Sequence, residues 1–193
     1  MPACAVQLSA RPVQKKLERL AREAGPRART DTPAEAVSNA DAILLAVHWS
    51  RLDDVLAQAG MLSRKTVITC SLPMTRNDSR MVLGLTTSGA ERLAARLRQA
   101  HVVSAFSTAP SEVLFSVFEE RKRKTRPDLV FCGNHKGAKK TAATLIRDVG
   151  FHPVDLGKLS AARYIEPFSL LLAEIAYNGS TGPQLAYRFE SLS

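Results

Sequence analysis

The chain is poor in cysteine and has no long hydrophobic run. Its three cysteines, Cys4, Cys70 and Cys132, form neither a Cys-x-x-Cys pair nor a metal-ligand spacing. This pattern argues against a disulfide framework and a metal site, and favours buried, reduced thiols in a cytosol. No hydrophobic segment approaches the ~20 residues that span a bilayer, and polar residues interrupt the amino end where a signal peptide would lie. We therefore expect a soluble, cytoplasmic protein without a membrane partner.

Acidic residues are also scarce. There are 18 Asp and Glu against 27 Lys and Arg, which gives a formal net charge of +9. Such an excess favours an anionic partner: a phosphorylated cofactor, a nucleic acid or a membrane surface. The basic run 121–126 lacks the interleaved aromatic residues that a platform for single-stranded nucleic acid needs. We interpret this run as a solvated loop and do not expect nucleic acid as a partner.

No arrangement typical of acid–base or nucleophilic catalysis is found. The four histidines, His48, His101, His135 and His152, stand in unrelated contexts, and none neighbours a nucleophile motif. Paired carboxylates, which general acid–base catalysis would use, are absent from the expected strand ends. We therefore predict no catalytic acid, base or nucleophile, and interpret the last three histidines as core or surface residues.

The central feature of the sequence is the hydrophobic stretch Asp41–Trp49. Its apolar residues, several of them β-branched, do not alternate with polar ones, which is typical of a strand buried on both faces of a parallel sheet. Ligands of such sheets bind beyond the carboxyl ends of the strands. The end of this stretch, Val47, His48 and Trp49, is therefore a candidate binding loop, although Trp49 serves equally well as a seal between the strand end and the next helix.

Strands and helices alternate along the rest of the chain. The expected strands are 3–8, 41–49, 66–69, 101–106, 129–132 and 152–155, and the expected helices are 12–24, 33–38, 50–59, 88–97, 111–120, 136–149 and about 160–177. Alternation with short loops predicts an α/β fold, a doubly wound, mostly parallel sheet. At 193 residues one domain is the default, with a carboxyl-terminal helical segment at about 158–178.

Small polar loops follow several of these strands. Ser9 and Arg11 come after the first strand, Cys70-Ser71-Leu72-Pro73 after the third, and Ser107-Thr108 after the fourth. An arginine after a strand of a dinucleotide-binding domain holds the ribose 2′-phosphate and so favours NADP over NAD. The loops predict cofactor binding rather than acid–base chemistry.

The order of these motifs resembles the NADP-dependent reductases of the deazaflavin coenzyme F420. The segments that carry the resemblance are Ser9–Pro12, Ala42–Trp49, Cys70–Met74, Thr87–Glu91, Val103–Thr108, Asp148–Gly157 and Ala161–Pro167. The last two are the most specific. The NADPH-oxidising domain of the transmembrane metalloreductases is similar through the same segments, and it shares the histidine at position 48.

The resemblance implies a Rossmann-like domain that binds NADP(H) and transfers a hydride directly between NADP(H) and a deazaflavin or flavin-type acceptor. It also implies a role for each candidate binding residue. Ser9 and Arg11 would meet the 2′-phosphate, Val47, His48 and Trp49 would line the path from adenosine to nicotinamide, and Cys70, Ser71, Leu72 and Pro73 would flank the nicotinamide. Direct hydride transfer needs stacking geometry and little else. The resemblance leaves the acceptor and the direction of transfer open.

One departure from the family is the absence of the Gly-x-Gly-x-x-Gly turn whose amides hold the pyrophosphate. We expect an amino-terminally truncated Rossmann-like fold in which cofactor binding is impaired, since each lost charge-assisted contact is worth roughly 1.5–3 kcal/mol. The alternative is a non-catalytic interaction module that keeps the fold and forms homo-oligomers through the apolar helix around 170–176. A homo-oligomer is expected in either case.

Overall fold

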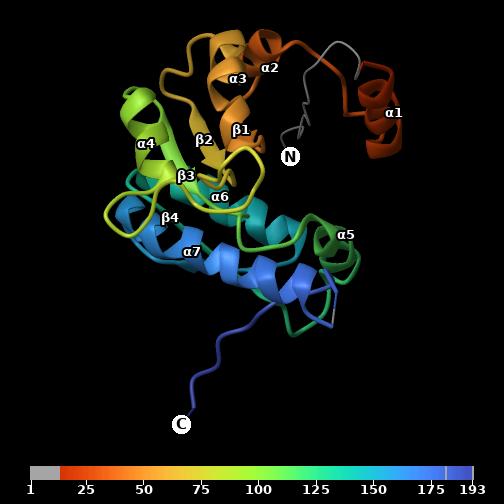
Figure 1. The fold of residues 1–193 in the computed structure, drawn as a ribbon. Helices are drawn as coiled ribbons and strands as arrows, with labels where there is room; N and C mark the ends of the chain where they lie inside the picture. The colour runs from red at the N-terminus through yellow and green to blue at the C-terminus, as the bar shows by residue number, and fades with distance from the viewer. Residues whose placement is uncertain (1–13, 181, 193) are drawn as a thin grey trace.

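The computed structural model describes residues 14–180 and 182–192 and shows three layers, with helices on both faces of a five-stranded sheet (Figure 1). The strand order is β1-β2-β3-β4-β5. β1 pairs with β2, β2 with β3 and β4 with β5 in parallel, whereas β3 and β4 are antiparallel. The fold is therefore the Rossmann-like, mostly parallel α/β fold that the sequence predicts.

The first half of the described chain builds one side of the sheet. Its elements are α1 (Gln14–Ala24), α2 (Pro33–Asn39), β1 (Ala42–Leu45), the 3-10 turn η2 (Trp49–Arg51), α3 (Leu52–Ala59), β2 (Thr66–Thr69), α4 (Gly89–Arg96) and β3 (His101–Ser104). Figure 1 shows α1 at the margin of the molecule, apart from the sheet. β1 lies at the edge of the sheet formed by the described residues, and its Leu44 is 55% exposed.

The second half closes the other side. Its elements are α5 (Ser111–Glu119), β4 (Asp128–Gly133), α6 (Lys136–Val149), β5 (His152–Asp155), the 3-10 turn η3 (Leu159–Ala161), α7 (Ala162–Ala173) and the π-helical segment η4 (Glu174–Asn178). After η4 the chain returns to the sheet, where Asp128 N–H donates to Tyr187 O at 2.8 Å. The basic run 121–126 forms turns and bends between α5 and β4, as expected of a solvated loop.

Alternate residues of the strands fill two hydrophobic cores. Val67, Val102 and Val130 face the core shared with α3, α4 and α7. Their neighbours Ile68, Val103 and Leu129 face the core shared with α5 and α6. Because successive side chains of a strand point to opposite faces, an unbroken hydrophobic strand serves both cores. This explains why the strands of the sequence show no alternation.

Two strands are shorter than the sequence predicts. The stretch 41–49 is extended only over Ala42–Leu45, because the His48 side chain caps a 3-10 turn that begins at Trp49. The stretch 101–106 ends at Ser104, and Phe106 has a φ of +69°, which no strand residue adopts. The predicted strand 3–8 lies outside the described residues.

Candidate functional site

The two predicted cofactor loops meet at one edge of the sheet. The Ser71 hydroxyl donates to Val47 O at 2.6 Å, and Cys70 N–H donates to Leu45 O at 3.4 Å. Parallel pairing of β1 with β2 puts both carboxyl ends at the same edge, and these bonds join the loops beyond it. Ser71 is buried at 8% exposure, so its hydroxyl holds the two loops together rather than facing solvent.

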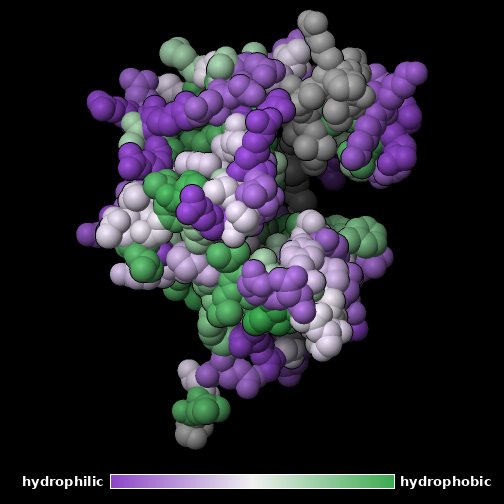
Figure 2. Space-filling view, viewed as in Figure 1, coloured by the Kyte–Doolittle hydropathy of each residue, from purple (hydrophilic) through white to green (hydrophobic). Residues whose placement is uncertain are grey.

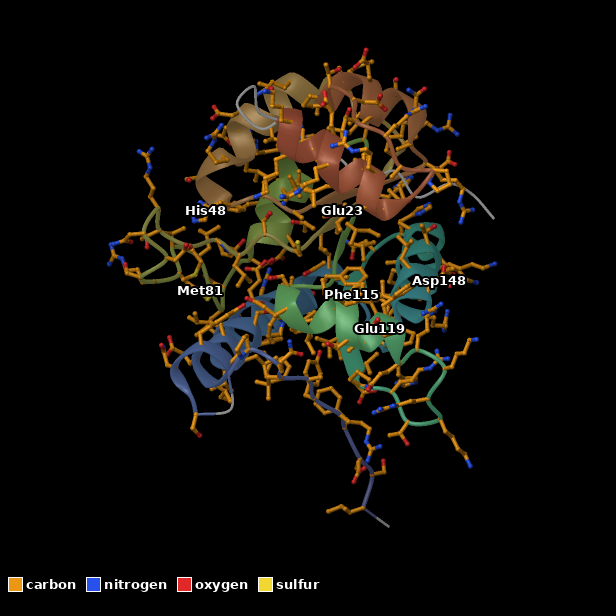
Figure 3. All side chains as sticks on the ribbon, turned by 90° about the vertical axis from the view of Figure 1, so that its right-hand side faces the viewer. Glu23, His48, Met81, Phe115, Glu119 and Asp148 are labelled. Atoms are coloured by element: carbon orange, nitrogen blue, oxygen red, sulfur yellow. The ribbon has the colours of Figure 1, made fainter. Side chains whose placement is uncertain are left out.

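His48 is fixed between its own loop and a distant one. Its Nδ1 accepts from Ser50 N–H at 3.1 Å, so the proton lies on Nε2, which donates to Asp78 Oδ1 at 2.9 Å. Asp78 belongs to the loop after β2, which folds back through a bridge between Met74 and Met81. Figure 3 shows His48 and Met81 one above the other on the same side of the view. The sequence analysis missed Asp78, since no local pattern links two loops thirty residues apart.

Trp49 and Pro73 form a wall that the first turn of α4 supports. A methyl group placed on Gly89 would lie 3.2 Å from Trp49 Cζ3, 3.2 Å from Pro73 Cδ and 3.3 Å from Glu166 Oε1. Only a residue without a side chain fits there comfortably. Trp49 packs against the hydrophobic core, as expected of a residue that seals the end of the strand. It also lies beside Pro73 of the predicted nicotinamide loop. Leu72, between Ser71 and Pro73, is half-buried.

Two carboxylates behind this wall have opposite electrostatic surroundings. Glu91 of α4 receives a bidentate pair of hydrogen bonds from Arg163 of α7, at 2.9 and 2.7 Å, and these bonds hold the pKa of Glu91 below its usual value. Glu166 of α7 is buried and forms no salt bridge within the described residues, and burial raises the pKa of Glu166 to about 6. Sequence reasoning singled out neither residue as functional.

The two described thiols are unsuited to nucleophilic chemistry. Cys70 and Cys132 are free, and burial raises the pKa of both, that of Cys132 to about 12. A neutral thiol is a weak nucleophile. Cys70 is therefore a small, uncharged group at the site. Cys4 lies outside the described residues.

The remaining strand-end residues are engaged in structural contacts. Ser107 accepts a hydrogen bond from Ser169 of α7 at 3.0 Å, and the Thr108 hydroxyl lies 2.8 Å from Tyr187 OH. Of the other histidines, His152 pairs with Asp128 and His101 stacks on His135. Polar character at a strand end therefore does not by itself identify a ligand contact.

Ser9 and Arg11, the predicted contacts of the 2′-phosphate, lie outside the described residues. Within 14–180 and 182–192, no group of three or more His, Cys, Asp or Glu side chains is arranged to hold a metal ion. In the same part of the chain, no helix combines the length and the hydrophobicity that crossing a bilayer requires.

Fold and loops define a Rossmann-like α/β protein, and comparison with known proteins is consistent with this class. The family model described as NADP oxidoreductase, coenzyme F420-dependent, matches residues 5–73. Metalloreductase STEAP3 of Rattus norvegicus is 30% identical over 138 residues, covering 72% of this chain and 27% of the relative. The F420-dependent NADP reductase of Methanocaldococcus jannaschii is 26% identical over 144 residues, covering 72% of this chain and 63% of the relative.

Solved structures support the fold. A candidate F420-dependent NADP-reductase of Arthrobacter sp. FB24 superposes with a TM-score of 0.77 at 18% identity, covering 88% of this chain and 78% of that one. A pyrroline-5-carboxylate reductase of Coxiella burnetii superposes with a TM-score of 0.55 at 17% identity, covering 86% and 53%. At these identities the likeness shows the fold alone.

The chain is thus similar to the coenzyme F420-dependent NADP oxidoreductases, which is the resemblance that its motifs carry. It spans less than two thirds of the length of both curated relatives.

Proposed function

We propose that this chain acts as one NADP-binding Rossmann-like domain of an oxidoreductase, which transfers a hydride directly between NADP(H) and a deazaflavin or flavin-type acceptor. The observation that carries the proposal is the junction of the two loops, where Ser71 binds Val47 O at the edge of the sheet. Two segments predicted to flank one cofactor lie side by side there. The family relationship supplies the cofactor class.

The described residues of this site fit a nicotinamide. The half-buried Trp49 offers hydrophobic surface, the fully buried Pro73 packs behind it, and the neutral Cys70 thiol brings no charge or nucleophile close to a reactive ring. When bound, NADP(H) supplies the hydride, so the protein need only bind, orient and exclude water. In this proposal Val47, His48 and Trp49 line the dinucleotide, and Cys70, Ser71, Leu72 and Pro73 flank its nicotinamide.

His48 is given a structural part in this proposal. Its two ring nitrogens are engaged by Ser50 and Asp78, so the imidazole orders the loop after β2 over the end of β1. Direct hydride transfer needs no acid or base from the protein, so the proposal assigns His48 no chemical role beyond ordering this loop. By analogy with the family, we propose that the protein works in a reducing cytosol. The acceptors to be compared are a deazaflavin, a flavin and a ferric chelate.

Isothermal titration with NADPH tests the proposal on this chain and on a version extended by the coding sequence upstream. Because no Gly-x-Gly-x-x-Gly turn occurs in the 193 residues, we expect this chain alone to bind weakly. Micromolar binding by the 193-residue chain would contradict impairment. Absence of binding by both versions would rule out the reductase.

The predicted selectivity for NADP is tested at Arg11. Arg11→Ala should weaken NADPH binding by roughly 10–100-fold, the equivalent of one charge-assisted contact, and leave NADH binding unchanged. Arg22→Ala removes the same charge from the exposed side of α1 and serves as the matched control. Equal losses in the two variants would show that Arg11 acts only through net charge.

The alternative is a non-catalytic module that assembles through α7. Tyr164, Leu171 and Ile175 lie on one outer stripe of α7 and η4, and are 68%, 55% and 44% exposed. In the space-filling view, hydrophobic residues lie beside hydrophilic ones over α7 (Figure 2). A stable dimer that binds no NADPH would favour this alternative, whereas a dimer that binds NADPH would support the homo-oligomeric reductase.

A further inference from the structure

Helix α7 places a buried carboxylate at the first turn of α4. Glu166 is 2% exposed, its Oε2 accepts from Gly89 N–H at 2.9 Å and its Oε1 accepts from Ala90 N–H at 3.0 Å. The first amides of a helix have no partner within the helix and lie at its positive end. Since no cation of the described chain pairs with Glu166, these two amides are its chief electrostatic partners.

Capping α4 does not by itself require this carboxylate. The Ser88 hydroxyl already accepts from Glu91 N–H at 3.1 Å, in the usual manner of an N-cap. The Arg163–Glu91 pair already joins α7 to α4. A buried carboxylate without a counter-ion is costly. Since Ser88 already caps α4 and the Arg163–Glu91 pair already joins the two helices, we expect another role for Glu166.

The neighbours of Gly89 indicate that role. Glu166 binds the amide of Gly89, and this glycine packs directly against Trp49 and Pro73, the two ends of the candidate binding loops. A chain of contacts thus runs from the interior of α7, through the start of α4, to the wall of the site. The Arg163–Glu91 pair acts one residue earlier, where Glu91 Oε2 accepts from the Ser88 hydroxyl at 2.9 Å.

We infer that Glu166 is a positioning residue for the proposed cofactor site, whose carboxylate holds Gly89 against Trp49 and Pro73 and thereby fixes the wall of that site. The inference rests on the proposed function for the identity of the site. The contacts that carry it exist without any cofactor.

The protonation state of Glu166 should therefore affect the wall. Protonation turns one carboxylate oxygen into a donor, so that one of the two amides loses its partner. The titratable groups that interact with Glu166 are Glu91 from α4, which is paired with Arg163 of α7, and Cys132 from β4. Burial raises the pKa of Glu166 to about 6, and Trp49 should sense the change at mildly acidic pH.

Trp49 reports this directly, because it is the only tryptophan of the chain. The experiment records its emission in the full chain without cofactor, at about pH 7.5 and down to about pH 5. Glu166→Gln should shift the emission at neutral pH, and Glu166→Asp should restore part of it. Glu91→Gln is the matched control: it weakens the ion pair with Arg163 that also joins α4 to α7, and it should leave the emission unchanged.

The pH profile is recorded in a His48→Asn background, because the adjacent imidazole can quench Trp49 on its own. We expect a transition near pH 6 in His48→Asn, and none when Glu166→Gln is added. Unchanged emission in a folded Glu166→Gln variant would overturn the inference. If that variant does not fold, a flat profile in His48→Asn alone would overturn it.

Titration with NADPH separates this inference from the proposed function. If the Trp49 emission responds to Glu166→Gln as expected but the protein does not bind NADPH, only the proposed function is contradicted. A Trp49 signal insensitive to Glu166, in a protein that binds NADPH, would contradict only the positioning role.

Discussion

The two faces of α7 carry similar hydrophobic residues in opposite surroundings. On the inner face, Ile165 and Leu172 are 1% and 7% exposed, and Ile165 belongs to the core shared by the sheet, α4 and α7. On the outer face, Leu171 is 55% exposed although its residue type is the same. The difference shows that helix amphipathicity cannot be read from hydrophobic content when both faces are apolar. The inner face should determine stability, and the outer face should determine assembly.

Truncation of the inner face should have the largest effect. Ile165→Ala removes a side chain from the core shared by the sheet, α4 and α7, and should lower the free energy of unfolding by about 2–5 kcal/mol. Leu171→Ala on the outer face should cost less than about 0.5 kcal/mol. Urea denaturation of both variants measures the contrast, and equal losses would refute the assignment of the two faces.

The next effect is a pH dependence that arises at Glu166. Its pKa is raised from 4.5 to about 6, so the folded state holds this proton more tightly than the unfolded state does. The contribution to stability is therefore fully present below about pH 4.5 and is lost as the pH rises through about 6. Relative to Glu166→Gln, the wild-type chain should gain ~1.5 kcal/mol between about pH 7 and pH 4.5. A difference that does not vary with pH would contradict the raised pKa.

Glu91 should show the opposite sign and a smaller effect. Hydrogen bonds from Arg163 lower its pKa, so its contribution is present at neutral pH and is lost as the pH falls through the depressed value. The pair is half-buried, and Glu91→Gln should cost about 1 kcal/mol at neutral pH. A double-mutant cycle with Arg163→Gln measures the coupling. Additive losses would show that the pair contributes nothing.

The smallest effect on stability, and the largest on assembly, is expected at Leu171. Leu171→Glu adds a charge to an exposed position and should change the free energy of unfolding by less than about 0.5 kcal/mol. If the outer face of α7 is the subunit interface, the variant should be monomeric by light scattering at concentrations where the wild-type chain is dimeric. Lys140→Glu on the exposed side of α6 is the control for added negative charge. A monomeric wild-type chain would refute the expected homo-oligomer.

Local signals predicted the elements that have clear boundaries. The strand Thr66–Thr69, the helix Lys136–Val149 with its stop at Gly150, and the strand His152–Asp155 are found as expected. Gly150 has a φ of +117°, which suits the glycine that ends α6. The strand 41–49 was predicted too long, because its hydrophobic character continues up to His48, whose side chain caps a 3-10 turn.

The candidate site was predictable in part. The pairing of loops 47–49 and 70–73 follows from the rule that parallel strands end at one edge, and the bond from Ser71 to Val47 confirms their proximity. Their roles toward a cofactor stay a prediction. Asp78, Gly89 and Glu166 were missed because each acts through a partner at least fifteen residues away, and no local spacing encodes such a contact.

The sequence alone determined the alternation of strands and helices, the sheet edge where the loops were expected to meet, and the resemblance to the F420-dependent NADP oxidoreductases. Periodicity, turn residues and motif order are local properties of a chain. Tertiary structure decided which apolar face of α7 is buried, which nitrogen of His48 carries its proton, and which carboxylate is left without a counter-ion. These depend on what lies opposite a side chain in space. Packing brought Glu166 to the amides behind Trp49, and only packing could do so.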